Sequence, residues 1–316
     1  MRFAGRSGRW PWRSAAWAGR VKMAAMTVRL PYIGRFAPSP TGPLHIGSLV
    51  AAMASYLDAR AHQGQWLVRI EDVDVGRNVA GADAHILASL QRCGMHWDGE
   101  VTWQTQRYAL YEQAVAQLGE LIYPCGCSRK DIAAAIYPGT CRHGLAPGKV
   151  GRALRLKLPQ QPHCVLSFDD RWFGHYSQDI TAEVGDYVLR RADGFWAYQL
   201  AVVVDDGAQG ITDIVRGADL LDSTPRQLYL QQALGLPQPS YLHMPVVVNE
   251  IGDKLSKQTG AQAFDDGGDP QLLLRNAMQP AARFLGLEVQ ADSIDAFWRA
   301  AVPAWAQLLQ TLPRGA

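Results

Sequence analysis

The order strand, loop, helix, strand over residues 32–74 constrains the fold of this chain more than any other feature. Residues 32–37 form a short apolar-rich run that predicts a strand, and the prolines in 38–43 exclude helix and central strand there. Leu49, Met53, Tyr56 and Leu57 then repeat at helical spacing, and residues 66–70 predict a second strand. This opening is typical of the α/β class with a doubly wound parallel sheet.

The rest of the chain continues the alternation of strands and helices. The apolar run Leu200–Val204 is typical of a buried parallel strand, and shorter runs at 211–215 and 246–248 predict two more strands. Helical patterns occupy residues 82–93, 108–121, 225–234, 272–278 and 294–309.

Periodicity is poor between Tyr123 and Gly151, where glycine, proline and cysteine gather. We therefore expect a Rossmann-type catalytic domain in two halves, 31–122 and 191–260, separated by a small zinc-containing insertion, 123–190, that includes an acceptor-binding-like subdomain. A short helical region, 261–316, follows. Apolar residues make up 48% of the chain and charged residues 19%, which suits a chain with a sizeable core.

Residues 1–30 differ in composition from the rest, with seven basic residues and no acid. They resemble a transit peptide, but we favour a disordered tail or an upstream start codon, with Met23 or Met26 as the true start. Subtracting them leaves 24 basic and 29 acidic residues in 31–316, a net charge of −5. The main part of the chain is therefore not a generally basic nucleic-acid binder, and RNA would require a local basic patch.

The length of the apolar runs and the number of cysteines indicate where in the cell the protein is located. No run of 18 apolar residues occurs, so we expect no transmembrane helix and no membrane partner. Five cysteines, an odd number in a long chain, argue against a secreted disulfide scaffold and favour a reducing, cytoplasmic location.

Two short motifs point to phosphate chemistry. His45-Ile46-Gly47-Ser48 opens the first predicted helix, whose N-terminal N–H groups suit phosphate, and His45 can donate to phosphate oxygens as charge develops. Lys254-Leu255-Ser256-Lys257 follows a predicted strand, and its lysines can neutralise departing pyrophosphate. Each motif alone fits a solvent-facing histidine or a solvated lysine pair, but their order beside predicted strands favours one shared nucleotide site.

In this order the two motifs resemble the HIGH and KMSKS motifs of the class I aminoacyl-tRNA synthetases. Segments 34–42, 69–72 and 214–219 resemble the glutamyl branch of that family. The resemblance runs from Gly34 to Gln258 and leaves no room for a large anticodon-binding domain. Ser48 replaces the last histidine of HIGH, which removes any role for a second histidine, and Leu255 and Gln258 depart from KMSKS.

The resemblance implies specific substrates. The short, stand-alone paralogues of the glutamyl branch activate L-glutamate with ATP and magnesium, without needing tRNA. They then attach glutamate to the queuosine base in the anticodon of tRNA(Asp). A truncated glutamyl-tRNA synthetase that charges tRNA(Glu), an inactive tRNA-binding paralogue, and a nucleotidyltransferase with another acid substrate are the alternatives. We expect a monomer.

The resemblance also implies the roles of individual residues, with His45 and Lys257 as the catalytic pair. The ATP-binding residues are His45, Gly47, Ser48, Lys254 and Lys257. The glutamate-binding residues are Arg35, Phe36, Ala37, Pro38, Ser39, Glu71, Tyr198 and Arg216. Paired guanidiniums favour a carboxylate over an amide, so glutamine would be rejected. The alternative for the two arginines is a structural ion pair with Asp72, Asp74 or Asp219.

Cys125, Cys127 and Cys141 are candidate ligands for one structural zinc ion, because the two thiolates of a C-x-C segment can face the same metal. Incidental buried thiols are the alternative. Chemistry alone favours His143 as the fourth ligand, whereas the resemblance implies a tyrosine at the place of Tyr137. We predict Tyr137 and keep His143 as the alternative. The isolated Cys93 and Cys164 are predicted to be core residues.

Overall fold

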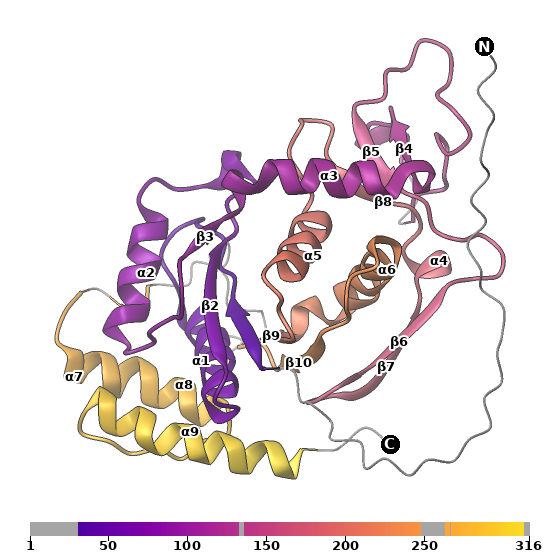
Figure 1. Cartoon of the computed structure of the whole chain (residues 1–316). Coiled ribbons are helices and arrows are strands. Elements are labelled where there is room, and N and C mark those ends of the chain that lie inside the picture. Colours follow the sequence, from indigo (N-terminus) through magenta and orange to yellow (C-terminus); the bar gives the residue numbers. More distant parts are fainter. Residues whose placement is uncertain (1–30, 133–135, 248–262, 266, 313–316) are drawn as a thin grey trace, which may run out of the picture. The chain divides into compact units, whose positions relative to one another are not determined.

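The computed structural model in Figure 1 describes residues 31–132, 136–247, 263–265 and 267–312. Residues from Pro31 onward form one compact unit. The segment 1–30 lies outside the described residues, so the structure does not test its interpretation.

The first part of this unit is a parallel sheet in the order β1-β2-β3. Helix α1 joins β1 to β2 and shares a hydrophobic core with both strands. The helix begins after His45, which caps its N-terminus, and ends before His62. The elements are β1 (Ile33–Phe36), α1 (Ile46–Ala61), β2 (Gln65–Ile70), α2 (Ala82–Arg92) and β3 (Thr102–Trp103). The strand, loop, helix, strand order predicted from the sequence is confirmed.

The second parallel pair completes this architecture. Strands β9 and β10 pair in parallel, with Arg216 opposite His243. Thr212, just before β9, donates its backbone N–H to the Ile33 carbonyl at 2.9 Å, so this sheet lies beside β1. The elements are α5 (Tyr198–Ala208), β9 (Asp213–Gly217), α6 (Thr224–Leu234) and β10 (Ser240–Met244). A parallel sheet covered by helices is therefore confirmed.

Segment 123–190, expected as an insertion, contributes to two different sheets. Strands β4, β5 and β8 form an antiparallel sheet of their own, whereas β6 and β7 form a hairpin whose β6 pairs in parallel with β10. The hairpin thus extends the second parallel sheet to the order β7-β6-β10-β9. The elements are α3 (Tyr108–Leu118), β4 (Ile122–Cys125), β5 (Ala153–Leu156), β6 (Val165–Asp170), β7 (Gly174–Asp179), α4 (Ile180–Glu183) and β8 (Tyr187–Arg190).

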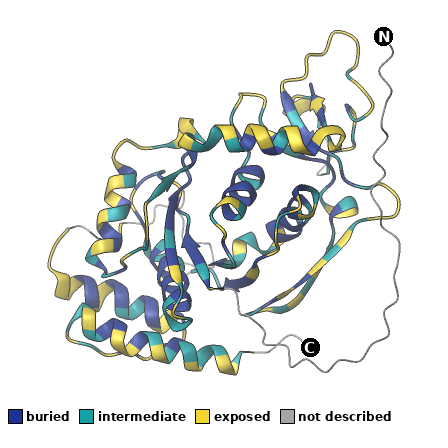
Figure 2. Ribbon diagram, in the orientation of Figure 1, coloured by how far each residue is buried: buried dark blue, intermediate teal, exposed yellow. Residues whose placement is uncertain are grey.

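The prediction of a strand at Leu200–Val204 is wrong, because these residues lie within helix α5. Leu200 to Asp206 are all buried, and Figure 2 shows this helix largely in the buried colour. A helix that is buried on every side has no polar face, so its sequence lacks helical periodicity and reads like a buried strand.

The strand predicted at 246–248 is displaced. The strand is β10, Ser240–Met244, and Pro245 follows it. Proline has no N–H to donate to a neighbouring strand, which explains why the strand ends there. Val246 and Val247 follow in irregular structure, and Val248 lies outside the described residues.

The C-terminal part is helical, as predicted. Figure 1 shows α8 and α9 beside α1, and Trp298 and Trp305 of α9 belong to the same hydrophobic core as α1. The elements are α7 (Pro270–Leu273), a π-helical segment (Leu274–Met278), α8 (Gln279–Phe284) and α9 (Ile294–Thr311). None of the helices in the described ranges is long and apolar enough to cross a membrane.

Candidate active site

A cavity of about 480 Å³ lies where the carboxyl ends of β1, β2, β9 and β10 meet the N-terminus of α1. In parallel α/β sheets, ligands bind at this edge. The cavity brings together every predicted ATP- and glutamate-binding residue that lies in the described part of the chain. These are Arg35, Phe36, Ala37, Pro38, Ser39, His45, Gly47, Ser48, Glu71, Tyr198 and Arg216.

His45 is the N-cap of α1, and its Nδ1 accepts a hydrogen bond from the backbone N–H of Ser48 at 3.3 Å. In a neutral imidazole this bond leaves the proton on Nε2, which can then act as a donor. The helix N-terminus adds a partial positive charge at the same place. This corner of the cavity therefore suits a phosphate group.

Arg35 is buried and points at an acid that the sequence analysis did not name. Its Nε and Nη2 donate to the two carboxylate oxygens of Asp206 at 3.0 and 3.2 Å. Two of the three acids considered as alternatives have other partners, since Asp72 accepts from Thr105 and Asp74 pairs with Arg191, and the third, Asp219, lines the same cavity as the two arginines. The charge of Arg35 is therefore already compensated by a carboxylate.

Arg69 connects this ion pair to Glu71. Its Nη1 donates to Asp206 at 2.8 Å, and its Nη2 lies 3.3 Å from a carboxylate oxygen of Glu71. Burial alone would raise the pKa of Asp206, but the charges of Arg35 and Arg69 hold it below its ordinary value. Burial raises the pKa of Glu71, although Arg69 and Arg35 oppose this shift. Arg35 and Glu71, which line the cavity, thus belong to a buried network of alternating charges that Asp206 and Arg69 complete behind the cavity wall.

Arg216 has a different environment. Its Nε donates to Nε2 of His243 at 3.0 Å, its Nη2 to Thr224 at 2.8 Å, and its Nη1 lies 3.4 Å from the Tyr198 hydroxyl. These groups carry no negative charge, and no carboxylate in the described residues forms an ion pair with Arg216. Of the two predicted arginines, Arg216 is the one whose positive charge remains available to a ligand.

Sequence reasoning missed the residues behind the cavity wall. Asp206 and Arg69 hold Arg35, and His243 with Asp170 stands behind Arg216. Asp205 and Asp206 come directly after the apolar run Leu200–Val204. Their position directly after an uninterrupted apolar run was the one available signal that they are buried.

Lys254 and Lys257 lie outside the described residues, as does the whole segment 248–262. The residues that flank this segment in the sequence lie at the cavity. Val247 lines the cavity, and Ala263 forms a backbone bridge with His45, which also lines it.

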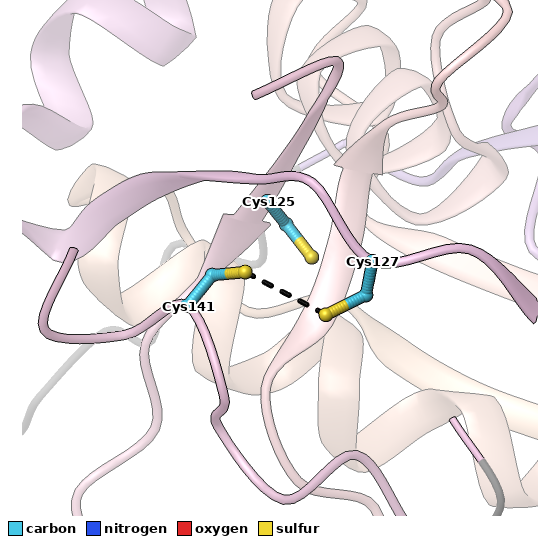
Figure 3. A group of neighbouring side chains, drawn as sticks. All are labelled: Cys125, Cys127 and Cys141. Carbon is cyan, nitrogen blue, oxygen red and sulfur yellow. Dashed lines mark hydrogen bonds between the residues drawn. The ribbon is translucent and has the colours of Figure 1, made fainter. Parts of the chain in front are cut away.

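The three cysteines of the predicted metal site lie together, as Figure 3 shows. The sulfur atoms of Cys125, Cys127 and Cys141 are all within 4.8 Å of one another. Burial raises the pKa of the Cys125 thiol, but hydrogen bonds from Tyr137, the Cys127 backbone and Arg155 lower it to about 7. The cluster therefore offers three thiol ligands at the spacing of one metal ion.

The two candidates for a fourth ligand, Tyr137 and His143, differ in their distance from this cluster and in their burial. The Tyr137 hydroxyl lies 3.4 Å from the sulfur of Cys125 and 3.5 Å from that of Cys127, and the ring is buried. His143 is exposed. The guanidinium of Arg155 lies over the Tyr137 ring, 3.7 Å from its centroid, and its Nε donates to Cys125 at 3.3 Å. Cys93 is a core residue as predicted, and Cys164 is partly buried beside another core cluster.

Comparison with known proteins identifies the family of this chain. Residues 33–134 and 143–293 match the family described as tRNA synthetases class I (E and Q), catalytic domain. The chain belongs to this family, which confirms the resemblance drawn from the motifs.

Closer relatives define the subgroup. The chain is 60% identical over 287 residues to the glutamyl-Q tRNA(Asp) synthetase of Verminephrobacter eiseniae, covering 87% of this chain and 97% of that protein. The corresponding protein of Janthinobacterium sp. is 58% identical, with the same coverage of both chains. Within the class, the chain is therefore a member of the glutamyl-Q tRNA(Asp) synthetases, ATP-dependent ligases of the aminoacyl-tRNA synthetase type.

A solved structure supports the fold. The glutamate-tRNA synthetase of Elizabethkingia anophelis superimposes with a TM-score of 0.65 at 28% identity, over 73% of this chain and 53% of that one. A second structure, a glutamate tRNA ligase from Elizabethkingia meningosepticum in complex with its amino acid, gives the same values. The chain spans about half the length of these two synthetases.

Proposed function

We propose that this protein activates L-glutamate with ATP to glutamyl-adenylate without requiring tRNA, and transfers glutamate to the queuosine base of tRNA(Asp). The observation that carries the proposal is the single cavity that holds His45, at a helix N-terminus, and Arg216, with an uncompensated positive charge. A nucleotide phosphate and an acidic amino acid can therefore bind side by side. The names of the relatives support tRNA(Asp) as the acceptor.

In this proposal Arg216 and Tyr198 bind the side-chain carboxylate of glutamate, while Ser39 and Glu71 face its ammonium group. Arg35, paired with Asp206, lines the same end of the cavity. Phe36, Ala37 and Pro38 form the adjoining wall. Glutamine, which carries a neutral amide, would leave the buried Arg216 charge unpaired, and this costs several kcal/mol, roughly the penalty for an uncompensated buried charge.

The α-carboxylate of glutamate attacks the α-phosphorus of ATP in line, and pyrophosphate leaves. ATP is expected as its magnesium complex. His45 donates a hydrogen bond to the phosphate oxygens, Gly47 supplies a backbone N–H group, Ser48 offers its hydroxyl, and Lys254 and Lys257 neutralise the leaving group. No protein nucleophile takes part, so positioning and charge neutralisation supply the rate acceleration. A hydroxyl of queuosine then attacks the adenylate and releases AMP.

For the cysteine cluster we propose one structural zinc ion bound by Cys125, Cys127, Cys141 and Tyr137. Three soft sulfur ligands and one oxygen at this spacing fit a closed tetrahedral zinc site. The cluster connects the end of β4 to the segment before β5, so the metal would brace this antiparallel sheet. Arg155 would offset part of the negative charge of the ligands.

The decisive experiment is glutamate-dependent exchange of pyrophosphate into ATP with no RNA present. We expect exchange with glutamate and none with glutamine. Transfer of labelled glutamate is then compared on queuosine-containing tRNA(Asp), the same tRNA without queuosine, and tRNA(Glu). Charging of tRNA(Glu) alone would identify a truncated glutamyl-tRNA synthetase instead, and no exchange under any condition would identify an inactive paralogue. We also predict that the protein is a monomer and that it is located in the cytoplasm. Size-exclusion chromatography with light scattering tests the monomeric state.

A further inference from the structure

His243 lies directly behind Arg216 and is fully buried. The two residues are opposite each other on the parallel strands β10 and β9, which sets their side chains on the same face of the sheet. The Nε2 atom of His243 lies 3.0 Å from Nε of Arg216, and its Nδ1 lies 2.7 Å from Oδ2 of Asp170. An acid, an imidazole and a guanidinium thus follow one another toward the cavity.

The chemistry of the guanidinium determines the state of the imidazole. Arginine nitrogens only donate hydrogen bonds, so Nε2 of His243 accepts and carries no proton. The proton is on Nδ1 and is donated to Asp170, which also accepts the backbone N–H of His243 at 2.9 Å. His243 is therefore neutral, in a single tautomer that Asp170 selects.

Asp170 is itself held in place. Its Oδ1 accepts the backbone N–H groups of Trp172 and Phe173, both at 2.9 Å, at the turn between β6 and β7. Burial alone would raise its pKa, but these bonds and His243 keep it below the ordinary value. The carboxylate therefore stays ionised, yet the imidazole separates it from Arg216.

This arrangement contrasts with Arg35, which is paired directly with Asp206. A carboxylate in place of His243 would compensate the charge of Arg216 and compete with a ligand carboxylate. A neutral acceptor fixes the direction of the guanidinium and leaves its charge available. The same logic applies to Thr224, whose hydroxyl accepts from Nη2 of Arg216 at 2.8 Å.

We propose that His243, oriented by Asp170, is a positioning residue that holds Arg216 for the side-chain carboxylate of glutamate and so sets the preference for glutamate over glutamine. The inference rests on the proposed function, because it assigns that carboxylate to Arg216. His243 does not line the cavity, so its effect passes through Arg216, both directly and by way of Thr224, whose hydroxyl lies 3.2 Å from Nε2 of His243.

The test compares His243→Asn with His243→Gln. Asparagine is too short to reach Arg216, whereas the amide oxygen of glutamine can occupy the place of Nε2 and accept from it. We expect His243→Asn to raise the KM for glutamate about tenfold or more, which corresponds to about 1.4 kcal/mol, while kcat and the KM for ATP change little. We expect His243→Gln to restore part of this loss. The ratio of glutamate to glutamine exchange should fall in parallel with the rise in KM.

His163→Asn is the matched control. His163 also has Nδ1 at 2.7 Å from an aspartate, Asp179, but the pair is exposed and away from the cavity, so its glutamate KM should be unchanged. Thr224→Val, a smaller change at Arg216, provides a second variant if the histidine variants fold poorly. Calorimetric titration of glutamate into each protein gives the same comparison without turnover.

The outcomes separate the two claims. If the wild-type protein neither binds glutamate nor exchanges pyrophosphate, the proposed function fails and the inference fails with it. If the wild type is active but His243→Asn and Thr224→Val leave the glutamate KM unchanged, only the inference is overturned. Equal rises in the KM for glutamate and for ATP would also overturn it, because they indicate a merely structural role.

Discussion

At the scale of single residues, the two arginines predicted to bind glutamate differ in what holds them. Arg35 is clamped by the carboxylate of Asp206, and Arg216 is surrounded by neutral acceptors. Both could be named from the sequence through the resemblance to the glutamyl branch. Their partners could not, because Asp206 is 171 residues away from Arg35 and His243 stands on the neighbouring strand.

This difference predicts different effects of two substitutions. Arg216→Ala should abolish glutamate-dependent pyrophosphate exchange with little loss of stability, because no buried carboxylate loses its partner. Arg35→Ala should impair exchange and also lower the free energy of unfolding by about 1–3 kcal/mol, because Asp206 is left with Arg69 alone. Denaturant unfolding and exchange assays of both variants check the prediction. A similar loss of stability in both variants would contradict it.

The environment of His243 predicts a pH dependence of stability. Burial lowers its pKa and Arg216 lowers it further, against an opposing hydrogen bond to Asp170. The unfolded chain therefore binds a proton near pH 6.5 that the folded chain does not, and the free energy of unfolding falls as the pH drops below about 6.5. Urea unfolding at pH 7.5 and pH 5.5 should show a smaller drop for His243→Gln than for the wild type. An equal drop in both proteins would refute this assignment.

At the scale of elements, prediction succeeded where polar residues interrupt the apolar ones and failed where a run of neighbouring residues is wholly apolar. Helix α2 has exposed residues between its buried ones, and its pattern was recognised. Helix α5 is buried along most of its length, so Leu200–Val204 was mistaken for a strand. Length and periodicity carry no information when every position is apolar.

The β4–β5 segment carries a prediction about metal. The purified protein should contain about one zinc ion per chain, as expected for a closed structural site. Tyr137→Phe should weaken zinc retention against a chelator, whereas His143→Ala should not, because His143 is exposed. Metal analysis by mass spectrometry after dialysis gives the answer. Loss of zinc in His143→Ala with retention in Tyr137→Phe would reverse the ligand assignment.

At the scale of the whole molecule, a few buried polar residues join parts of the chain that are distant in sequence. Asp58 in α1 accepts hydrogen bonds from Tyr32 at 2.6 Å and from Trp305 in α9 at 3.1 Å, and it pairs with Arg171 beyond β6. This single carboxylate links the first parallel sheet, the β6–β7 hairpin and the C-terminal helices. No pattern in the sequence marked it, apart from its being the first acid in the chain.

Asp58→Asn should therefore destabilise the whole unit. The amide cannot compensate the charge of the partly buried Arg171, and breaking a pair of which only the carboxylate is fully buried costs about 2–3 kcal/mol. Glu112→Gln, at an exposed position on α3, is the control and should change stability by less than about 0.5 kcal/mol. Thermal unfolding of both variants measures the difference. A small effect of Asp58→Asn would mean that the three parts are held together by apolar packing alone.

The sequence by itself determined the class of the fold, the family and, among the described residues, those predicted to bind the ligands, which line one cavity, because these depend on local patterns and on motifs that are contiguous in the chain. His45 at a helix start, the arginines beside strand ends and the paired cysteines were all recognisable in this way. Only the tertiary structure decided which partner each buried charge has, since electrostatic pairing depends on distance in space and not on spacing in sequence. Asp206 with Arg35, and Asp170 with His243 and Arg216, are such pairings, and they determine which charges remain available to a ligand.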